Sequence, residues 1–179
     1  IIANPGSGVT QLLIALKPLH DAATVTRLNI ATYQAVSGVG REGVDELARQ
    51  TAQLLNARPV ESVVYPKQIA FNLLPQIGEF LDNGYTQEEM KMVWEVRKIL
   101  DTPDMPVNPT TVRVPVFFGH SEVVNVELAQ PLTTAQATAM LRQSSAITVM
   151  DGVKFGDVPT PVTEAVHSDS IYVGRIRAD

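Results

Sequence analysis

An arginine and a histidine in the second half of the chain have the side-chain types that anion binding and proton transfer require. Arg113 lies in the apolar segment 111–118, where a charge is costly unless it has a partner or a ligand. His120 follows Gly119, a residue that can carry a bulge and re-aim a side chain. Arg113 and His120 are seven residues apart, so an ideal strand would place them on opposite faces, and a bulge or turn at Gly119 has to bring them together. A joint site is one interpretation; the alternatives are a strand-edge ion pair for Arg113 and a loop histidine with satisfied hydrogen bonds for His120.

Glu88 and Lys91 are a second candidate pair. They stand three residues apart in a segment that we expect to be helical, so they share one helix face. Taken alone, the pair is typical of a solvent-exposed ion pair. His20 and His167 have no partner that the sequence indicates.

A glycine-rich segment, 38–43 (GVGREG), matches the G-x-G-x-x-G pattern of dinucleotide-binding turns, and Glu61 lies downstream of it. It follows a predicted strand and precedes a predicted helix, as such a turn requires. However, the preceding strand contains Arg27, Asn29 and Gln34, whereas a central parallel strand is nearly continuously apolar. We therefore interpret the segment as a turn leading into a helix and predict no cofactor site in this chain.

Hydrophobic periodicity and capping patterns predict the elements that must position these side chains. Helices are expected at 9–23, where Pro18 should kink or shorten the helix, at 42–55, with Val44, Leu47, Ala48 and Leu54 on its apolar side, and at 87–100 and 134–143. Capping boxes, Thr86 with Glu89 and Thr133 with Gln136, mark the starts of the last two helices. Strands are expected at 25–36, 111–118, 122–129, 146–150 and 170–176, and a proline-punctuated loop at 57–85.

This order of elements predicts an α+β fold. The strands at 111–118 and 122–129 are adjacent in sequence, which favours antiparallel pairing between them, and the last two strands should close the sheet. We expect a mixed sheet with helices packed mainly on one face.

The composition limits the class of protein. The 179 residues fit one domain, 1–179, and 45% hydrophobic content is enough for a core. A net charge of −5 argues against a nucleic-acid partner, and no apolar stretch is long enough to span a membrane. The absence of cysteine excludes disulfides and thiolate metal sites, and it is consistent with a reducing compartment. We predict no metal site.

Several segments together resemble the aspartate-semialdehyde dehydrogenases. They are Asn4-Pro5 before a helix, 32–38 (TYQAVSG), Phe71-Asn72, 88–91 (EEMK), 112–116 (VRVPV), 119–122 (GHSE) and 172–177 (YVGRIR). The resemblance covers essentially the whole chain. It implies the fold of the glyceraldehyde-3-phosphate dehydrogenase C-terminal domain, a homodimer, and a cytoplasmic oxidoreductase of lysine, threonine and methionine biosynthesis. In that family NADPH reduces aspartyl phosphate to aspartate semialdehyde with release of phosphate.

The resemblance also implies a role for each candidate residue. His120 matches the acid/base histidine, Arg113 the arginine that pairs with the substrate carboxylate, and Gln34 the glutamine that orients the substrate. Glu88 and Lys91 match a helix pair that shapes the substrate and phosphate site. Aspartate semialdehyde and phosphate are therefore expected as weak ligands.

Two departures from the family pattern affect the expected activity. Ser7 occupies the position of the nucleophilic cysteine, within a Gly6-Ser7-Gly8 segment that resembles an engineered linker. A serine hydroxyl needs a dedicated base and forms an oxygen ester, so it does not replace a thiolate. The chain starts near the active-site helix, and we expect the NADP-binding domain to be absent from it. The prediction is an inactive catalytic and dimerisation domain; the alternative is a self-associating scaffold module engineered from the enzyme.

Overall fold

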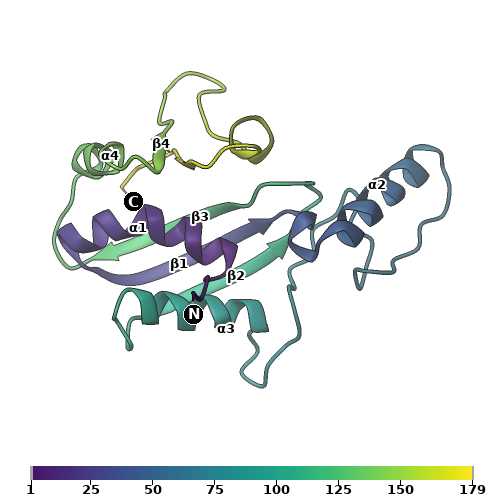
Figure 1. Ribbon diagram of the computed structural model, residues 1–179, viewed down its shortest axis with the longest axis horizontal. Coiled ribbons are helices and arrows are strands. Elements are labelled where there is room, and N and C mark those ends of the chain that lie inside the picture. The colour runs from purple at the N-terminus through teal and green to yellow at the C-terminus, as the bar shows by residue number, and fades with distance from the viewer. Residues whose placement is uncertain (1, 179) are drawn as a thin grey trace.

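A three-stranded sheet in the order β2-β1-β3 forms the centre of the protein in the computed structural model, which describes residues 2–178 (Figure 1). The central strand β1 pairs parallel with β2 and antiparallel with β3. Along the chain the elements are α1 (Ser7–Ala23), β1 (Val25–Gln34), the 3₁₀ helix η1 (Val36–Val39), α2 (Arg41–Leu55), α3 (Gln87–Ile99), β2 (Val107–Arg113), β3 (Ser121–Leu128), α4 (Thr134–Arg142), β4 (Ile147–Val149), the π-helical turn η2 (Pro161–Ala165) and β5 (Ile171–Val173).

Helices α1 and α3 cover one face of this sheet and form the main core with it. Side chains alternate along β1, so that Leu28, Ile30, Thr32 and Gln34 are buried. The buried apolar residues of this core are Val9, Leu12, Leu13, Leu16, Val25, Leu28, Ile30, Met92, Val93, Val96, Leu100, Met105 and Val107. The mixed sheet with helices on one face confirms the predicted α+β class.

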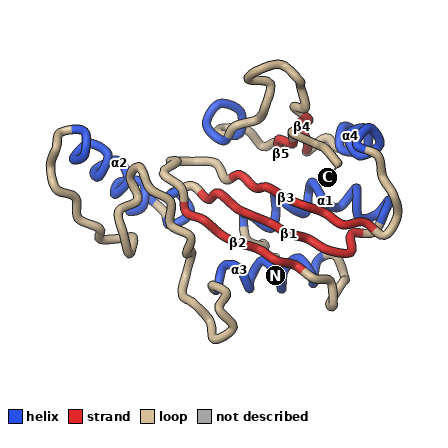
Figure 2. Tube along the Cα trace, turned by 180° about the vertical axis from the view of Figure 1, so that it is seen from behind, coloured by secondary structure: helices blue, strands red, loops and turns tan. Residues whose placement is uncertain are grey.

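Within residues 2–178, no helix covers the opposite face of the sheet (Figure 2). This open face carries the alternate side chains, which are exposed or half-buried: Arg27, Asn29, Ala31, Tyr33, Asn108, Thr110, Val112, Val123, Asn125 and Glu127. The face mixes apolar and polar groups. Tyr33 is 39% exposed and Val123 56% exposed, whereas Arg27 and Glu127 form an ion pair of 3.9 Å.

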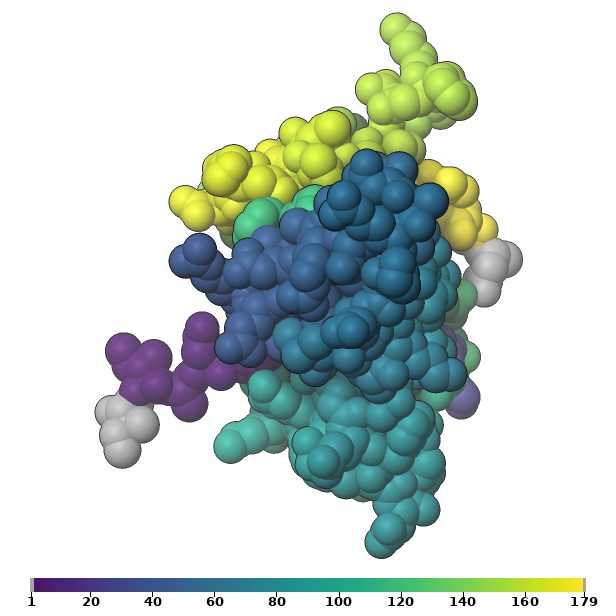
Figure 3. Space-filling view, turned by 90° about the vertical axis from the view of Figure 1, so that its right-hand side faces the viewer, coloured from purple at the N-terminus to yellow at the C-terminus, as the bar shows by residue number. Residues whose placement is uncertain are grey.

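Residues 41–74, which we call the arm, extend beyond the end of the sheet (Figure 1) and lie at the front when the molecule is viewed from that end (Figure 3, blue). The rest of the described chain is the body. Helix α2 and the irregular segment after it enclose a small core of Val36, Leu47, Tyr65, Ile69, Ala70 and Leu74. A bridge between Leu74 and Arg113 joins the arm to β2, with backbone N–H to O distances of 3.0 and 2.9 Å.

The structure corrects the strand predicted at 111–118. The strand runs from Val107 to Arg113, because β2 is an edge strand and tolerates Pro109, which has no N–H to donate. The chain then leaves the sheet, and the carbonyls of Val116 and Phe117 accept from the N–H groups of Val36 and Ser37. The predicted antiparallel pairing of the two neighbouring strands is also wrong, because β1 lies between them.

Pro18 was expected to kink or shorten α1; the helix is not shortened and continues to Ala23, because its apolar side is fixed in the core. Two smaller expectations were wrong. Strands β4 and β5 do not close the main sheet; they form a separate parallel pair beside α4. Ala48 is exposed, since the fully buried positions of α2 are Gly43, Glu46, Leu47 and Gln50.

Both predicted capping boxes are confirmed. Thr86 accepts from the Glu89 N–H while the Glu89 carboxylate accepts from the Thr86 N–H, and Thr133 and Gln136 repeat the arrangement at α4. The Glu89 carboxylate also accepts from the Thr111 N–H at 2.9 Å, which ties α3 to β2. None of the helices in the described part of the chain is long and apolar enough to cross a membrane.

Candidate anion-binding site

The candidate residues meet where β1 and β2 end. These strands run parallel, so their carboxyl ends lie at the same edge of the sheet, and Gln34 of β1 is directly opposite Arg113 of β2. His120 immediately precedes β3, whose first residue, Ser121, is paired with Tyr33. Helices α1 and α3 begin near this edge, which is a common place for ligand sites in sheets with parallel strands.

The peptide groups of Ala35 hold the two most reactive candidates. Its N–H donates to Nδ1 of His120 at 3.0 Å, and its carbonyl oxygen accepts from Nη1 of Arg113 at 2.7 Å. The turn expected at Gly119 is present, with φ of 87°. The structure therefore brings together the pair that an ideal strand would have separated.

The hydrogen bond to Nδ1 also fixes the chemical form of His120. Nδ1 accepts a hydrogen bond from the Ala35 N–H, so it carries no proton in the neutral ring. The ring proton is therefore on Nε2, which acts as the donor. Burial lowers the pKa of His120, and the positive charge of Arg113 lowers it further. Near neutral pH, His120 is thus an uncharged donor.

Arg113 is a buried cation with a fork suited to an oxyanion. It is 5% exposed, and burial lowers its pKa, whereas Tyr65 and Glu88 act in the opposite direction. A guanidinium offers five donors in one plane, and the bond to Ala35 uses one of them. A planar fork of this kind matches a carboxylate or a phosphate.

Gln34 and Glu88 lie side by side next to Arg113. The Gln34 amide nitrogen is 3.3 Å from Oγ1 of Thr32 and 3.5 Å from Oε1 of Glu88. Gln34 is 4% exposed, so its side chain is fixed inside the site.

Lys91 of α3, three residues after Glu88, lies against the start of α1. Its ammonium is 3.9 Å from Oε1 of Glu95, and Oε2 of Glu95 accepts from the Gly6 N–H at 2.8 Å. A Cβ added at Gly6 would lie 3.6 Å from Nζ of Lys91. Lys91 therefore lies beside Ser7, which is exposed and begins α1.

Sequence reasoning missed a second acidic group at this site. Glu122 points inward from β3, its Oε1 accepts from the Gln11 amide at 2.7 Å, and a Cβ added at Gly8 would lie 3.1 Å from it. Burial raises the pKa of Glu122 to about 7, and the Gln11 hydrogen bond partly opposes this. The available signal was a carboxylate at an inward position of an alternating strand.

Each glycine of the segment 38–43 has a structural explanation that requires no ligand: close packing at Gly38 and Gly43, and backbone conformation at Gly40. A Cβ at Gly38 would lie 2.8 Å from Nη1 of Arg113, and one at Gly43 would lie 2.5 Å from the Tyr65 hydroxyl. Gly40 has φ of 94°, which favours glycine. In a dinucleotide-binding turn these glycines would face the pyrophosphate. Here two of them face side chains of the protein, so the segment does not fit that cofactor, and the interpretation as a turn explains it better.

No group of three or more histidines, aspartates or glutamates within residues 2–178 is arranged to hold a metal ion.

Comparison with known proteins identifies the class of this domain. Residues 16–179 match the family described as semialdehyde dehydrogenase, dimerisation domain. The chain belongs to this family.

The curated relatives are aspartate-semialdehyde dehydrogenases, which confirms the resemblance predicted from the sequence. One from Legionella pneumophila is 52% identical over 179 residues, covering 100% of this chain and 52% of the relative, and one from Aquifex aeolicus is 39% identical. The chain spans about half the length of the relatives it matches.

Solved structures agree with the fold. Aspartate semialdehyde dehydrogenase II from Vibrio cholerae, in a structure described as complexed with ASA, superimposes with a TM-score of 0.97 at 52% identity, over 100% of this chain and 52% of that one. The Francisella tularensis enzyme gives a TM-score of 0.84 at 29% identity. The fold is the predicted glyceraldehyde-3-phosphate dehydrogenase-like C-terminal domain.

Proposed function

We propose that the edge of the sheet formed by β1 and β2 is a substrate site of the aspartate-semialdehyde dehydrogenase type. The observation that carries the proposal is the Ala35 peptide, which holds a buried guanidinium and a neutral imidazole next to each other. A substrate with a carboxylate and a phosphate, such as aspartyl phosphate, offers both of the anions that this site is suited to bind. A Vibrio cholerae relative is described as complexed with ASA, which supports the substrate class.

The proposed roles follow from the position of each side chain. Arg113 binds the substrate carboxylate through its fork, and Lys91 attracts phosphate as a point charge. Gln34 orients the substrate, and Glu88, whose Oε1 is 3.5 Å from the Gln34 amide nitrogen, helps to shape the site beside it. His120 donates from Nε2 to the substrate oxygen on which negative charge develops, a task for which a neutral ring with a low pKa is suited.

Catalytic turnover is not part of the proposal. Ser7 stands at the nucleophile position, and a serine without a dedicated base does not form the reactive acyl intermediate that a thiolate does. The turn at 38–43 does not fit a nucleotide, because Gly38 and Gly43 face the side chains of Arg113 and Tyr65.

Phosphate binding tests the site. We expect calorimetry to show saturable binding of inorganic phosphate and of aspartate semialdehyde. Replacement of Arg113 by lysine keeps the charge and removes the fork, so binding should weaken by about tenfold or more. Arg142→Lys, at an exposed position of α4, is the matched control and should bind as the parent does. Equal binding by the Arg113→Lys and Arg142→Lys variants would refute the proposed site.

We also propose that the open face of the sheet is the surface through which two copies form a homodimer. The family described for this chain is a dimerisation domain, and this face exposes Tyr33 and Val123 with no helix of the described chain over it. Backbone groups of the central strand are already paired on both sides, so the contact is between side chains, face to face.

Sedimentation at micromolar concentration tests the dimer. The parent should sediment as a dimer, and Val123→Asp should sediment as a monomer, because an unpaired carboxylate would be buried between the copies. Val153→Asp changes a fully exposed valine away from this face and should leave the dimer intact. A dimer that survives Val123→Asp would show that the interface is not the open face.

A cytoplasmic location remains a prediction from the sequence, and the comparisons lend no support to the engineered-scaffold alternative.

A further inference from the structure

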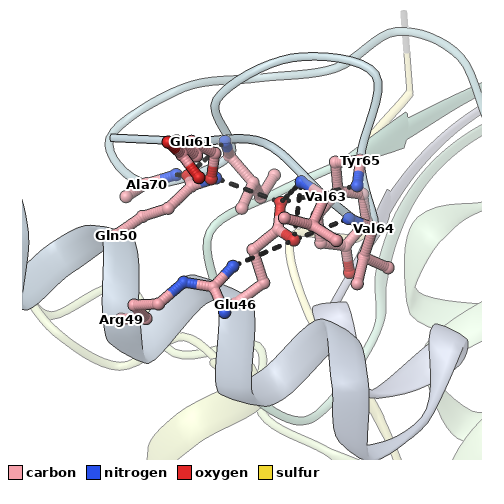
Figure 4. Close-up of polar contacts among 9 residues, drawn as sticks. Glu46, Arg49, Gln50, Glu61, Val63, Val64, Tyr65 and Ala70 are labelled. Carbon is pink, nitrogen blue, oxygen red and sulfur yellow. Dashed lines mark hydrogen bonds and ion pairs between the residues drawn. The ribbon is translucent and has the colours of Figure 1, made fainter. Parts of the chain in front are cut away.

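The arm contains a buried carboxylate, that of Glu46, which is not among the candidate substrate-site residues. Glu46 of α2 is 1% exposed. It accepts from the backbone N–H groups of Val63 at 3.1 Å, Val64 at 2.6 Å and Tyr65 at 3.4 Å (Figure 4). Burying a carboxylate is costly, and three consecutive N–H donors offset that cost. The arrangement fixes the backbone of 63–65 against α2.

Gln50, one helical turn further along α2, ties down the next part of the same segment. Its Oε1 accepts from the N–H groups of Ile69 and Ala70 at 2.9 and 3.1 Å. Its Nε2 donates to Glu46 at 3.0 Å and to the carbonyl of Glu61 at 3.3 Å (Figure 4). We call Glu46 and Gln50 the latch, because together they fix an irregular segment that has few hydrogen bonds of its own.

The latch places Tyr65 against the end of β1. The Tyr65 hydroxyl donates to the carbonyl oxygen of Val36 at 3.3 Å, and Tyr65 is 7% exposed. A Cβ at Gly43 would lie 2.5 Å from this hydroxyl and 2.8 Å from the Val36 oxygen, so there is no free space around the contact.

Tyr65 is also close enough to Arg113 for the two to influence each other. Burial raises the pKa of Tyr65, and the charge of Arg113 opposes that rise. Val36 directly follows Ala35, whose peptide groups hold both His120 and Arg113. A contact that fixes the Val36 carbonyl therefore restricts the same short stretch of backbone that orients the site.

We propose that Tyr65, fixed by the latch, is a positioning residue for Arg113 and His120, and that it acts through the Ala35–Val36 backbone. The assignment of Arg113 and His120 as substrate-binding groups rests on the proposed function above. The positioning itself is a property of this chain that can be measured without substrate.

Tyr65→Phe tests the proposal, because it removes the hydroxyl and keeps the ring in the arm core. In the ¹⁵N-labelled chain, the pKa of His120 should rise toward its ordinary value, because the Ala35 N–H and the Arg113 charge are held less closely. Affinity for inorganic phosphate should fall about three- to tenfold, the range expected when a site loses one buried hydrogen bond that orders it. Gly43→Ala, which displaces the hydroxyl from the other side, should raise the pKa of His120 in the same direction.

Two controls separate positioning from simple destabilisation. Leu54→Ala weakens the arm core but keeps the hydroxyl, and Tyr172→Phe removes a hydroxyl of the separate β4–β5 pair that is bonded to Ser168. Both should leave the pKa of His120 and the phosphate affinity unchanged. The proposal is overturned when Tyr65→Phe leaves the pKa of His120 where it is in the parent. Failure of the parent chain to bind phosphate would instead contradict the proposed function, and the His120 titration would still decide the positioning.

Discussion

The body and the arm are held together in different ways. Among residues 2–178, the main core of the body consists of thirteen buried apolar residues, most of them from α1, α3 and the sheet. The small core of the arm has five, together with Val36 of the body, and is completed by the buried polar side chains Glu46 and Gln50. Apolar burial is strong but has no direction, while hydrogen bonds fix particular atoms. Apolar packing therefore forms the sheet and the edge where β1 and β2 end. The hydrogen bond from Tyr65 of the arm fixes the backbone at Val36, just beyond that edge.

The site lies at the junction of the two regions. Gln34, Glu88 and Arg113 come from the body, and their geometry follows from strand pairing and from the start of α3. The Ala35 and Val36 peptides, by contrast, contact Arg113, His120 and Tyr65 through single hydrogen bonds. We therefore expect variants of the body core to change global stability, and variants of Tyr65 and of the latch residues Glu46 and Gln50 to change local order and site geometry.

The largest expected effect is a loss of global stability from a substitution in the body core. Leu28 is 0% exposed in the central strand, so Leu28→Ala should lower the free energy of unfolding by about 3–4 kcal/mol through lost burial and a cavity. Leu47→Ala in the arm should cost less, because the smaller core there can collapse around the change. Urea unfolding measures both variants, and a larger loss for Leu47→Ala would invert the comparison.

The next largest effect is local unfolding of the arm while the body stays folded. Glu46→Gln leaves one of the two acceptor oxygens, so the N–H groups of 63–65 lose partners and local opening should become easier by about 2–3 kcal/mol. Hydrogen exchange should accelerate at these amides and stay unchanged in β1. Asp45→Asn, at a neighbouring exposed position of α2, is the control. Equal acceleration in β1 would show that arm and body unfold as one unit.

The stability of the body should depend on pH through the buried carboxyl group of Glu122. The pKa of Glu122 is raised from 4.5 to about 7, so folding takes up a proton between these values. The resulting stabilisation is fully present below pH 4.5 and is lost as the pH rises through about 7. Glu122→Gln should therefore be more stable than the parent at pH 8 by up to about 3 kcal/mol and equal to it at pH 4. Parallel stability curves for the two proteins would contradict the raised pKa.

The smallest expected effect compares two capping boxes of the same type. Thr86→Ala should cost about 1–2 kcal/mol, because Thr86 is buried and its partner Glu89 also holds β2. Thr133→Ala at the exposed start of α4 should cost about 0.5–1 kcal/mol. Thermal unfolding of the two variants gives this difference, and a reversed order would mean that the tie to β2 contributes little.

Local signals in the sequence predicted much of the fold. The capping boxes placed the starts of α3 and α4 correctly, because cap and partner are only three residues apart. The 111–118 strand failed because Pro109 reads as a strand breaker, and its tolerance depends on β2 being an edge strand, which is a property of the whole sheet. Sheet order itself is a long-range property that neighbouring residues do not encode.

The candidate site was predicted unevenly for the same reason. Arg113 stood out as a charge in an apolar segment, and the turn at Gly119 was expected from the odd spacing to His120. The roles of Gln34, Glu88 and Lys91 came from the family resemblance and stay predictions. Glu46 was missed because its partners are backbone N–H groups 17 to 19 residues away, and such groups leave no mark in the sequence.

A ¹⁵N-resolved spectrum of the His120 ring, recorded across neutral pH, tests the central claim that the Ala35 peptide organises this site. The account predicts a neutral ring with Nδ1 as a hydrogen-bond acceptor, the proton on Nε2, and a pKa below the ordinary value for histidine. A ring protonated on Nδ1, or one that titrates at the ordinary histidine pKa, would contradict it.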